Sequence, residues 1–485
     1  MCIKPPKISN KSKLLSNDFG GLFNGSLINV LGKALIIPSS FLLIPILTRN
    51  LYAEEYGAWS LIISSIGLIL PFSGMGLSSA LSRYGPSSGL EELRNAFSTL
   101  FTLKVITHLI IAFLLILFRN EFGRVFFGEQ ATISIYVGII LLFAALEPLY
   151  KRIFKIRGRI IHFSLFEIWN NYSVIILAVV FATKGELFTF LKAFIVLKFL
   201  NIIILSFLIG KTFKILTVDT TIWKKYKNYG GYAAVISITF WVINSSDRFL
   251  LSAFKSLEDV GIYNAVYSIG HIPRTISALI TFLLLVSLSK MYDSRQHDKV
   301  IKILFKAENL FIAIVIPIIL GSALFSKDVV LFFSTERIAQ FSSPNLFIIT
   351  LSHFFLGIAT FRSYPFLLKK QQKIPAVIWI IAMLLNIIVN LTLIPILGIL
   401  GSSLATFLSY FFAFSCIMYF SRSKINYGYS FRLVIILTLS AAIANGVGLG
   451  VQKLFDFSIF ILILIVGVVY AVLISSSIKQ LILSN

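Results

Sequence analysis

Apolar residues in this chain run together in blocks of about 20 rather than recurring in the amphipathic periods of a soluble protein. A helix of that length spans the hydrocarbon core of a bilayer, because it rises about 1.5 Å per residue. In a chain that is 57% hydrophobic, the blocks predict an all-α integral membrane protein with about fourteen transmembrane helices. We place these helices at 25–48, 57–82, 97–118, 132–150, 161–182, 187–210, 230–254, 261–288, 302–325, 344–368, 375–396, 399–420, 431–452 and 457–480.

Basic residues are concentrated on one side of the predicted bundle. With a cytoplasmic N-terminus, the cytoplasmic segments hold 27 Lys or Arg and 6 Asp or Glu, whereas the outer loops hold 8 and 10. This positive-inside distribution predicts a multi-pass protein of the cell (plasma or inner) membrane with both termini in the cytoplasm. It also accounts for most of the net charge of +23. Because no soluble face is predicted to present the basic residues, we expect no nucleic-acid partner.

Two short patterns recur along the chain. RNLYAEEYGAWS at 49–60 and RFLLSAFKSLEDVGIYNA at 248–265 share an acidic pair, one residue, Gly and, two residues later, an aromatic residue. YKRIFKIRGRIIHFSLFEIWNN resembles FLLKKQQKIPAVIWIIAMLLN at an offset near 210. Each pair lies six spans apart, so both copies keep one membrane orientation. The repeat predicts two parallel six-helix lobes around a central cavity, plus an appended C-terminal helix pair.

The repeat divides the chain into predicted regions. They are a cytoplasmic tail at 1–24, an N-lobe at 25–210, a cytoplasmic linker at 211–229, a C-lobe at 230–420 and two appended helices at 431–480. The division between the eleventh and twelfth spans rests on a short joint from Gly398 to Gly401.

Three stretches carry a family resemblance: PILTRNLYAEEYGAWS, INSSDRFLLSAFKSLEDVGIYNAVYSI and NIIVNLTLIPILGILGSSLATFLSY. In order and spacing the chain resembles the polysaccharide and lipid-linked oligosaccharide flippases (O-antigen flippase-like) of the multidrug/oligosaccharidyl-lipid/polysaccharide exporter (MOP) superfamily. The resemblance implies export of a polyprenyl-diphosphate-linked glycan for O-antigen, capsule or exopolysaccharide assembly.

Charges inside the predicted spans need an explanation, because a charge at a helix centre costs roughly 2.5–3.5 kcal/mol on insertion scales. Glu147, Glu167 and Glu308 lie near a cytoplasmic end, where we expect hydration, as for Lys306 and Arg362. The deep charge is therefore predominantly positive. The remaining charged residues of the spans are Lys33, Lys104, Lys192, Lys198, Asp247, Arg248 and Arg274.

Polar residues form stripes at helical spacing on the first, seventh and eighth predicted spans. We interpret them as a hydrated cavity in which the cations meet the diphosphate, while Asn and aromatic side chains meet sugars. The candidate cavity residues are Lys33, Arg248, Arg274, Asn29, Trp241, Asn244, Asn264 and His271.

A structural interpretation stands beside this one. Asp247 pairs with Arg248 or another cation, or carries a proton, and Ser and Asn side chains bond neighbouring helices. His271 senses protonation or is a satisfied interhelical histidine. Asn386 and Asn390, which share a helix face, favour helix packing.

The sequence contains no phosphate loop, no Cys and His cluster and no extended soluble domain. We therefore expect no enzyme activity, catalytic residue, cofactor or metal. The predicted function is a flippase acting by alternating access. A drug or organic-cation antiporter of the same superfamily is the alternative, and a polytopic glycan polymerase or ligase a more remote one. Expected partners are the lipid-linked glycan and membrane lipids, with polysaccharide polymerase and glycosyltransferases as further candidates and a monomer as the preferred state.

Overall fold

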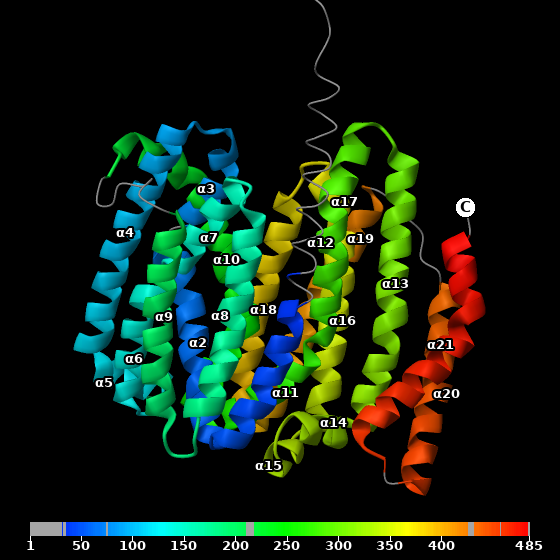
Figure 1. Cartoon of the computed structure of the whole chain (residues 1–485). Helices are drawn as coiled ribbons and strands as arrows, with labels where there is room; N and C mark the ends of the chain where they lie inside the picture. The colour runs from blue at the N-terminus through cyan, green and yellow to red at the C-terminus, as the bar shows by residue number, and fades with distance from the viewer. Residues whose placement is uncertain are drawn as a thin grey trace, which may run out of the picture. The chain divides into compact units, whose positions relative to one another are not determined.

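The computed structural model describes residues 32, 35–73, 76–209, 218–424, 431–455 and 457–483, and all regular structure within them is helical (Figure 1). The helix Leu35–Asn50 comes first. It is followed by α2 (Ala53–Ser73), α3 (Leu77–Tyr84), η1 (Gly85–Ser87), α4 (Leu90–Leu117), α5 (Arg119–Phe126), α6 (Ala131–Ala144), α7 (Glu147–Ile156), α8 (Ile160–Phe181), α9 (Leu187–Ile209), α10 (Thr220–Phe254), α11 (Leu257–Gly270), α12 (Ile272–Asp293), α13 (His297–Leu324), α14 (Ser326–Phe333), α15 (Glu336–Ala339), α16 (Asn345–Arg362), α17 (Tyr364–Leu368), α18 (Lys373–Leu397), α19 (Ile399–Arg422), α20 (Phe431–Leu454) and α21 (Ile459–Leu483).

The prediction of an all-α membrane protein is confirmed. Within the described ranges, nine helices are long and apolar enough to cross a membrane, and three shorter apolar helices accompany them. The predicted number of fourteen spans is not confirmed by this count. Large apolar side chains on the outer faces are exposed, among them Phe207 at 84% and Ile396 at 76%. Such faces are unfavourable in water but suit contact with acyl chains.

The chain forms two compact units. Unit 1 comprises the described residues within 1–46, 69–117 and 135–234, and unit 2 comprises those within 47–68, 118–134 and 235–485. In unit 1, α7 contacts α3, α4, α8 and α9, and its Ile153 and Phe154 are fully buried in the core. The predicted lobe boundaries stay a prediction.

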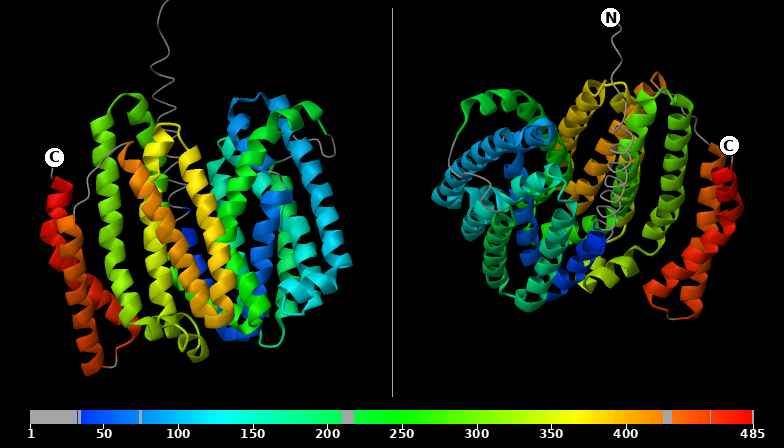
Figure 2. Two further views of the ribbon diagram at one scale, coloured as in Figure 1. Left: turned by 180° about the vertical axis from the view of Figure 1, so that it is seen from behind. Right: turned by 45° about the horizontal axis from the view of Figure 1, so that its top comes forward.

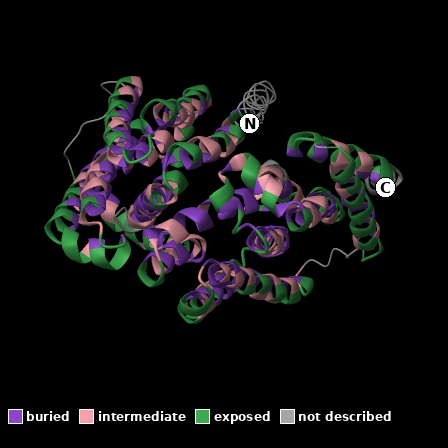
Figure 3. Cartoon of the chain, turned by 90° about the horizontal axis from the view of Figure 1, so that it is seen from below, coloured by how far each residue is buried: buried purple, intermediate pink, exposed green. Residues whose placement is uncertain are grey.

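Unit 2 is built around α16, which packs against α11, α12, α13 and α19. Phe311 of α13 and Phe361 of α16 lie in its core, with ring centroids 5.5 Å apart. Figure 2 shows α18 and α19 side by side, and α20 and α21 pack on α13. Within each unit, buried positions gather where helices face their neighbours (Figure 3). This leaves apolar outer faces for lipid.

Three spans predicted as continuous helices are broken. The breaks separate α6 from α7, α11 from α12 and α16 from α17, and each lies within a few residues before a proline: Pro148, Pro273 and Pro365. Proline lacks the N–H that would continue the hydrogen-bond ladder, which explains the breaks. The expected joint between the eleventh and twelfth spans exists: Gly398 separates α18 from α19 at φ +57°, a conformation that glycine adopts without strain.

The turns of the second repeated pattern have the same backbone geometry. Gly158 follows α7 at φ +67°, and Lys370 follows α17 at φ +56°. In each turn the next N–H donates to the carbonyl five residues earlier at 2.8 Å, which is the hydrogen bond of a Schellman cap. The donors and acceptors are Arg159 and Phe154 in the first copy and Gln371 and Phe366 in the second. Helices α7 and α17, which belong to the two copies of this pattern, therefore end in the same type of cap.

The acidic pairs of the first repeated pattern also do equivalent work. The side chain of the second acid of each pair accepts a hydrogen bond at the start of its own helix: Glu55 accepts from the Tyr52 N–H at 2.9 Å, and Asp259 accepts from the Ser256 hydroxyl at 2.6 Å. The Ser256 hydroxyl in turn caps α11 by accepting from the Asp259 N–H at 3.0 Å. The first acid of each pair accepts from a residue ahead of a later helix. Glu54 accepts from Gln130, before α6, and Glu258 from Arg337, in α15 before α16.

Candidate functional site

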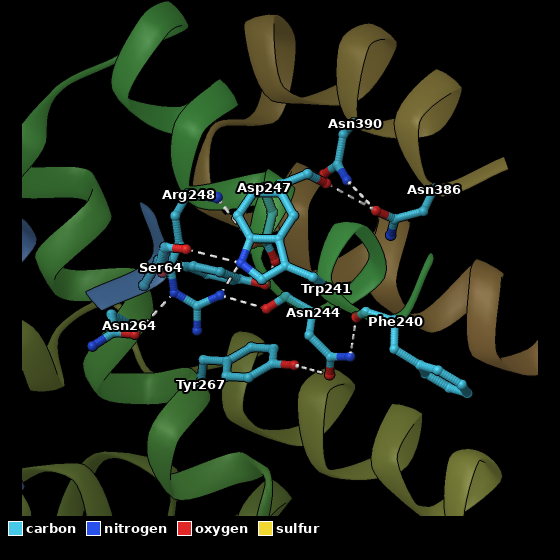
Figure 4. Close-up of polar contacts among 12 residues, drawn as sticks. Ser64, Phe240, Trp241, Asn244, Asp247, Arg248, Asn264, Tyr267, Asn386 and Asn390 are labelled. Carbon is cyan, nitrogen blue, oxygen red and sulfur yellow. Dashed lines mark hydrogen bonds and ion pairs between the residues drawn. The ribbon is translucent and has the colours of Figure 1, made fainter. Parts of the chain in front are cut away.

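The candidate site of unit 2 lies where α10 and α11 meet (Figure 4), and Arg274 of α12 is bonded to it through Asn244. Helix α10 supplies Trp241, Asn244, Asp247 and Arg248. Their spacing is close to the helical repeat, so their side chains lie on the same side of α10. Two further candidate residues, Lys33 and Asn29 of the first predicted span, lie outside the described residues.

The guanidinium of Arg248 is buried and surrounded by acceptors. Its Nε donates to Oδ1 of Asn264 at 3.0 Å, and its Nη1 to the carbonyl of Asn244 at 2.6 Å. The Arg248 Nη1 also lies 3.2 Å from Oδ1 of Asp247. The guanidinium carbon stands 4.6 Å from the ring centroid of Tyr267, within range of a cation–π interaction. Arg248 is therefore held in one orientation by groups of the protein.

Asp247 is 1% exposed, and its carboxylate accepts from three donors, one of them the Arg248 backbone N–H at 2.8 Å. Oδ1 accepts from Arg248, and Oδ2 accepts from the hydroxyl of Tyr263 at 2.5 Å. The geometry matches the interpretation in which Asp247 is the partner of Arg248. A buried carboxylate with such partners avoids most of the desolvation penalty of an isolated charge.

The side-chain oxygen of Asn244 collects hydrogen bonds from three elements. It accepts from Nη1 of Arg274 in α12 at 2.5 Å, from the hydroxyl of Tyr410 in α19 at 2.9 Å and from that of Tyr267 in α11 at 3.4 Å. The amide nitrogen of Asn244 donates to the carbonyl of Phe240. Asn244 thus links the environments of Arg248 and Arg274, because the carbonyl and the side chain of this one residue each accept from one of them.

Arg274 differs from Arg248 in its surroundings. Arg274 is exposed, and no described acidic residue forms an ion pair with it. One guanidinium nitrogen of Arg274 donates a hydrogen bond to Asn244. The remaining donors of the Arg274 fork can meet an incoming anion.

Trp241 and His271 both contact other residues of unit 2. The indole N–H of Trp241 donates to the carbonyl of Ser64 in α2 at 2.9 Å, so it is used within the protein. His271 lies in the one-residue turn between α11 and α12, and its carbonyl accepts from the Thr275 N–H at 3.4 Å across that turn. The ring of His271 lies 6.3 Å from that of His353.

The tyrosines of the site were missed in the sequence. Tyr263 and Tyr267 are one turn apart on α11, and Tyr56 of α2 accepts from the Asn264 amide at 3.0 Å. The spacing of Tyr263 and Tyr267 beside Asn264 was a usable signal. Tyr410 is about 140 residues further along the chain, and nothing local pointed to it.

Two other buried ion pairs correct the expectation of hydrated acids. Glu147 is 4% exposed and accepts from Lys198 at 3.1 Å and from Asn201 at 3.0 Å, in unit 1. Glu308 is 2% exposed and accepts from Arg362 at 2.7 Å, in unit 2. These acids neutralise cations inside the helix bundle instead of facing water.

Lys104 has a structural partner in unit 1. Its Nζ donates to the carbonyl of Ala145 at 3.2 Å, at the break between α6 and α7. The helix interruption before Pro148 frees this carbonyl, so a lysine can satisfy it. On α18, Asn390 donates to Asn386 at 3.0 Å and both are fully buried, which agrees with helix packing.

No group of three or more His, Cys, Asp or Glu residues that could hold a metal ion occurs in the part of the chain that the structure describes. The arrangement is instead two guanidinium groups joined through Asn244, with Asp247 as the neighbouring carboxylate.

The fold is shared with solved membrane transporters. A structure of the lipid II flippase MurJ in an inward closed conformation aligns with a TM-score of 0.75 and 17% identity, covering 95% of this chain and 98% of that one. An inward-facing multidrug resistance MATE transporter of the MOP superfamily aligns at 0.67 and 14%, covering 82% and 98%. A MOP superfamily transporter from Pyrococcus furiosus aligns at 0.58 and 16%, covering 84% and 95%.

The sequence comparisons are more specific. No curated protein matches the chain. Residues 46–343, more than half of the chain, match the family described as Polysaccharide biosynthesis protein. The predicted resemblance is thereby confirmed at the level of family and superfamily fold, and the chain is a multi-pass membrane protein that belongs to the polysaccharide biosynthesis protein family.

Proposed function

We propose that this protein is a flippase that moves polyprenyl-diphosphate-linked oligosaccharide units from the cytoplasmic to the outer leaflet of the cell membrane. The units serve assembly of a surface polysaccharide such as O-antigen, capsule or exopolysaccharide. Both termini lie in the cytoplasm, and the protein works as a monomer by alternating access. Family membership and the transporter fold support this proposal.

The observation that carries the proposal is the exposed guanidinium of Arg274, with which no described acidic residue forms an ion pair. Arg274 shares Asn244 with Arg248, and Arg248 is the arginine that pairs with the Asp247 carboxylate. The cluster therefore holds one more positive charge than negative, and Arg274 is the exposed member. A guanidinium fork matches phosphate oxygens in two hydrogen bonds, which a diphosphate can accept.

The two arginines have different roles in this proposal. Arg274 contacts the diphosphate, whereas Arg248 is a positioning residue that holds Asn244 and Asn264. The predicted contributions of Lys33 and Asn29 rest on the sequence alone. His271 lines the break beside Arg274, where a change of helix direction can accompany transport.

The rival function is antiport of drugs or organic cations, since MATE transporters share the fold. A cationic substrate requires exposed acidic groups in the site. Asp247 is instead buried and bonded to Arg248 and Tyr263. The Pyrococcus furiosus transporter is described as having a binding pocket of reverse polarity that suggests a different function, so charge sign varies on this fold.

Deletion of the gene tests the proposal in cells. We expect surface glycan to disappear and its lipid-linked unit to accumulate on the cytoplasmic leaflet. Complementation with the wild-type gene restores the glycan, and Arg274→Gln at equal protein level does so poorly. Normal glycan together with increased drug sensitivity in the deletion strain would support the antiporter instead.

A further inference from the structure

A cavity of about 360 Å³ lies in unit 2, one helical turn from Asn244. Helices α10, α12, α16, α17 and α18 supply its walls, and its lining includes Thr239, Phe240, Thr360, Ser363, Gln372 and Trp379. Its volume is within the range of small-ligand sites. Phe240 connects it to the arginine cluster, because its carbonyl accepts from the Asn244 amide.

No residue that lines this cavity in the described structure is charged. The arginine cluster therefore provides the charge, and the cavity next to it accepts an uncharged group. On α12, Thr281 of the cavity follows Arg274 by two turns, which places the two about 10 Å apart along the helix. A molecule with a charged group and a neutral group of this separation can occupy both.

The polar groups of the lining are arranged to accept hydrogen bonds. The hydroxyls of Thr239, Thr360 and Ser363 donate to carbonyls of their own helices at 2.9, 2.8 and 2.7 Å. Each hydroxyl keeps acceptor lone pairs, for which the described residues supply no donor. These oxygens can therefore accept from the hydroxyls of a ligand.

Donors are present in the same cavity. The indole N–H of Trp379 and the side-chain amide of Gln372 have no hydrogen-bond partner among the described residues, although both side chains line the space. Trp379 packs on Phe240 with ring centroids 5.1 Å apart, so its indole is held in place. A fixed aromatic ring offers an electron-rich face to C–H groups.

We infer that this cavity is a subsite for a neutral sugar ring of the substrate. The inference rests on the proposed function, since the sugar is attached to the diphosphate that Arg274 binds. Hydroxyl acceptors, two free donors and aromatic walls without charge match a pyranose, whose edges are polar and whose faces carry C–H bonds. A bare isoprenoid chain would leave the lone pairs of these hydroxyls unused and the buried indole N–H of Trp379 without an acceptor, which is unfavourable.

The test compares two probes binding to the purified full-length protein. One is undecaprenyl diphosphate, and the other is the same lipid carrying N-acetylglucosamine. Thr239→Val and Thr360→Val each remove one hydroxyl at nearly constant volume. We expect each to weaken binding of the sugar-bearing probe about 2- to 10-fold and to leave the bare probe unchanged.

Two control variants keep the test falsifiable. Thr360→Ser keeps the hydroxyl and should bind both probes like wild type. Thr392→Val makes the same change on an exposed residue of α18 that also bonds its own helix, and should have no effect. Equal weakening of both probes, stronger binding of the bare lipid or no change in either Val variant would overturn the sugar subsite.

Arg274→Gln separates this inference from the proposed function. It should weaken both probes alike, because both carry the diphosphate. Unchanged binding of both probes to Arg274→Gln contradicts the diphosphate site, whatever the threonine variants show. Loss of both probes in Arg274→Gln together with unaffected threonine variants contradicts the subsite alone.

Discussion

Gly57 of α2 and Gly261 of α11 lie against each other's backbone in unit 2. A Cβ on Gly57 would overlap the carbonyl oxygen of Leu257, and a Cβ on Gly261 would overlap that of Ala53. Each glycine therefore meets the residue four positions before the other. The two copies of the repeated pattern cross at equivalent points, as expected for helices related by a local twofold axis.

This crossing predicts that Gly261→Ala destabilises the protein. Overpacking against backbone costs about 1–3 kcal/mol, which exceeds the gain of about 1 kcal/mol from alanine's helix propensity. Thermal unfolding in detergent measures the change. Gly446→Ala in α20 is the matched control, because a Cβ there meets nothing within 4 Å, and it should stabilise. A rise in Tm for both variants would contradict the close crossing.

Because the ion pair of Glu308 and Arg362 is buried, we expect the stability of the protein to depend strongly on both partners. Arg362→Met leaves a buried carboxylate without its cation and should cost about 3–5 kcal/mol. Replacing both residues with Met should recover most of that loss, since no charge then remains. The exposed pair of Lys327 and Glu336 provides the comparison, and Lys327→Met should change thermal stability far less. Equal effects at the two pairs would be inconsistent with burial of Glu308.

Substitution by lysine should affect transport differently at the two arginines of the site. Arg248 uses Nε and Nη1 on separate acceptors, so Arg248→Lys loses at least one charged hydrogen bond and should reduce transport about tenfold or more. Arg274→Lys keeps the exposed charge and should be milder. Initial transport rates per protein measure both, with Arg124→Lys on α5 as a control. A larger effect at Arg274 than at Arg248 would reverse the assigned roles.

Transport of a diphosphate should depend on membrane potential. Moving one elementary charge through 100 mV changes the free energy by about 2.3 kcal/mol, and an inside-negative potential favours outward movement of an anion. Vesicles with an imposed potassium diffusion potential provide the measurement. Rates that do not change with potential would mean that a co-moving cation balances the charge.

The helical class was predictable because bilayer thickness fixes the length of an apolar run. The interruptions before Pro148, Pro273 and Pro365 could not be predicted from the prolines alone, since Pro71, Pro317 and Pro395 lie inside unbroken helices. The repeat was predictable because both copies need the same caps and turns.

Partners that are distant in the chain could not be predicted. Glu147 and Lys198 are 51 residues apart, and Glu308 and Arg362 are 54 apart, on helices whose facing sides only tertiary packing decides. The position of an acid near a helix end suggested hydration for Glu147 and Glu308. Burial instead follows from the neighbouring helices, which carry the matching cations.

The most direct test of the central claim is translocation by the purified protein in vesicles. An undecaprenyl-diphosphate-linked glycan is placed in one leaflet, and its appearance in the other is followed with a membrane-impermeant glycan-modifying enzyme. We expect movement well above that in protein-free vesicles, together with a marked loss in Arg274→Gln at equal protein level. Movement no faster than in protein-free vesicles, alongside transport of an organic cation by the same vesicles, would contradict the flippase and favour the antiporter.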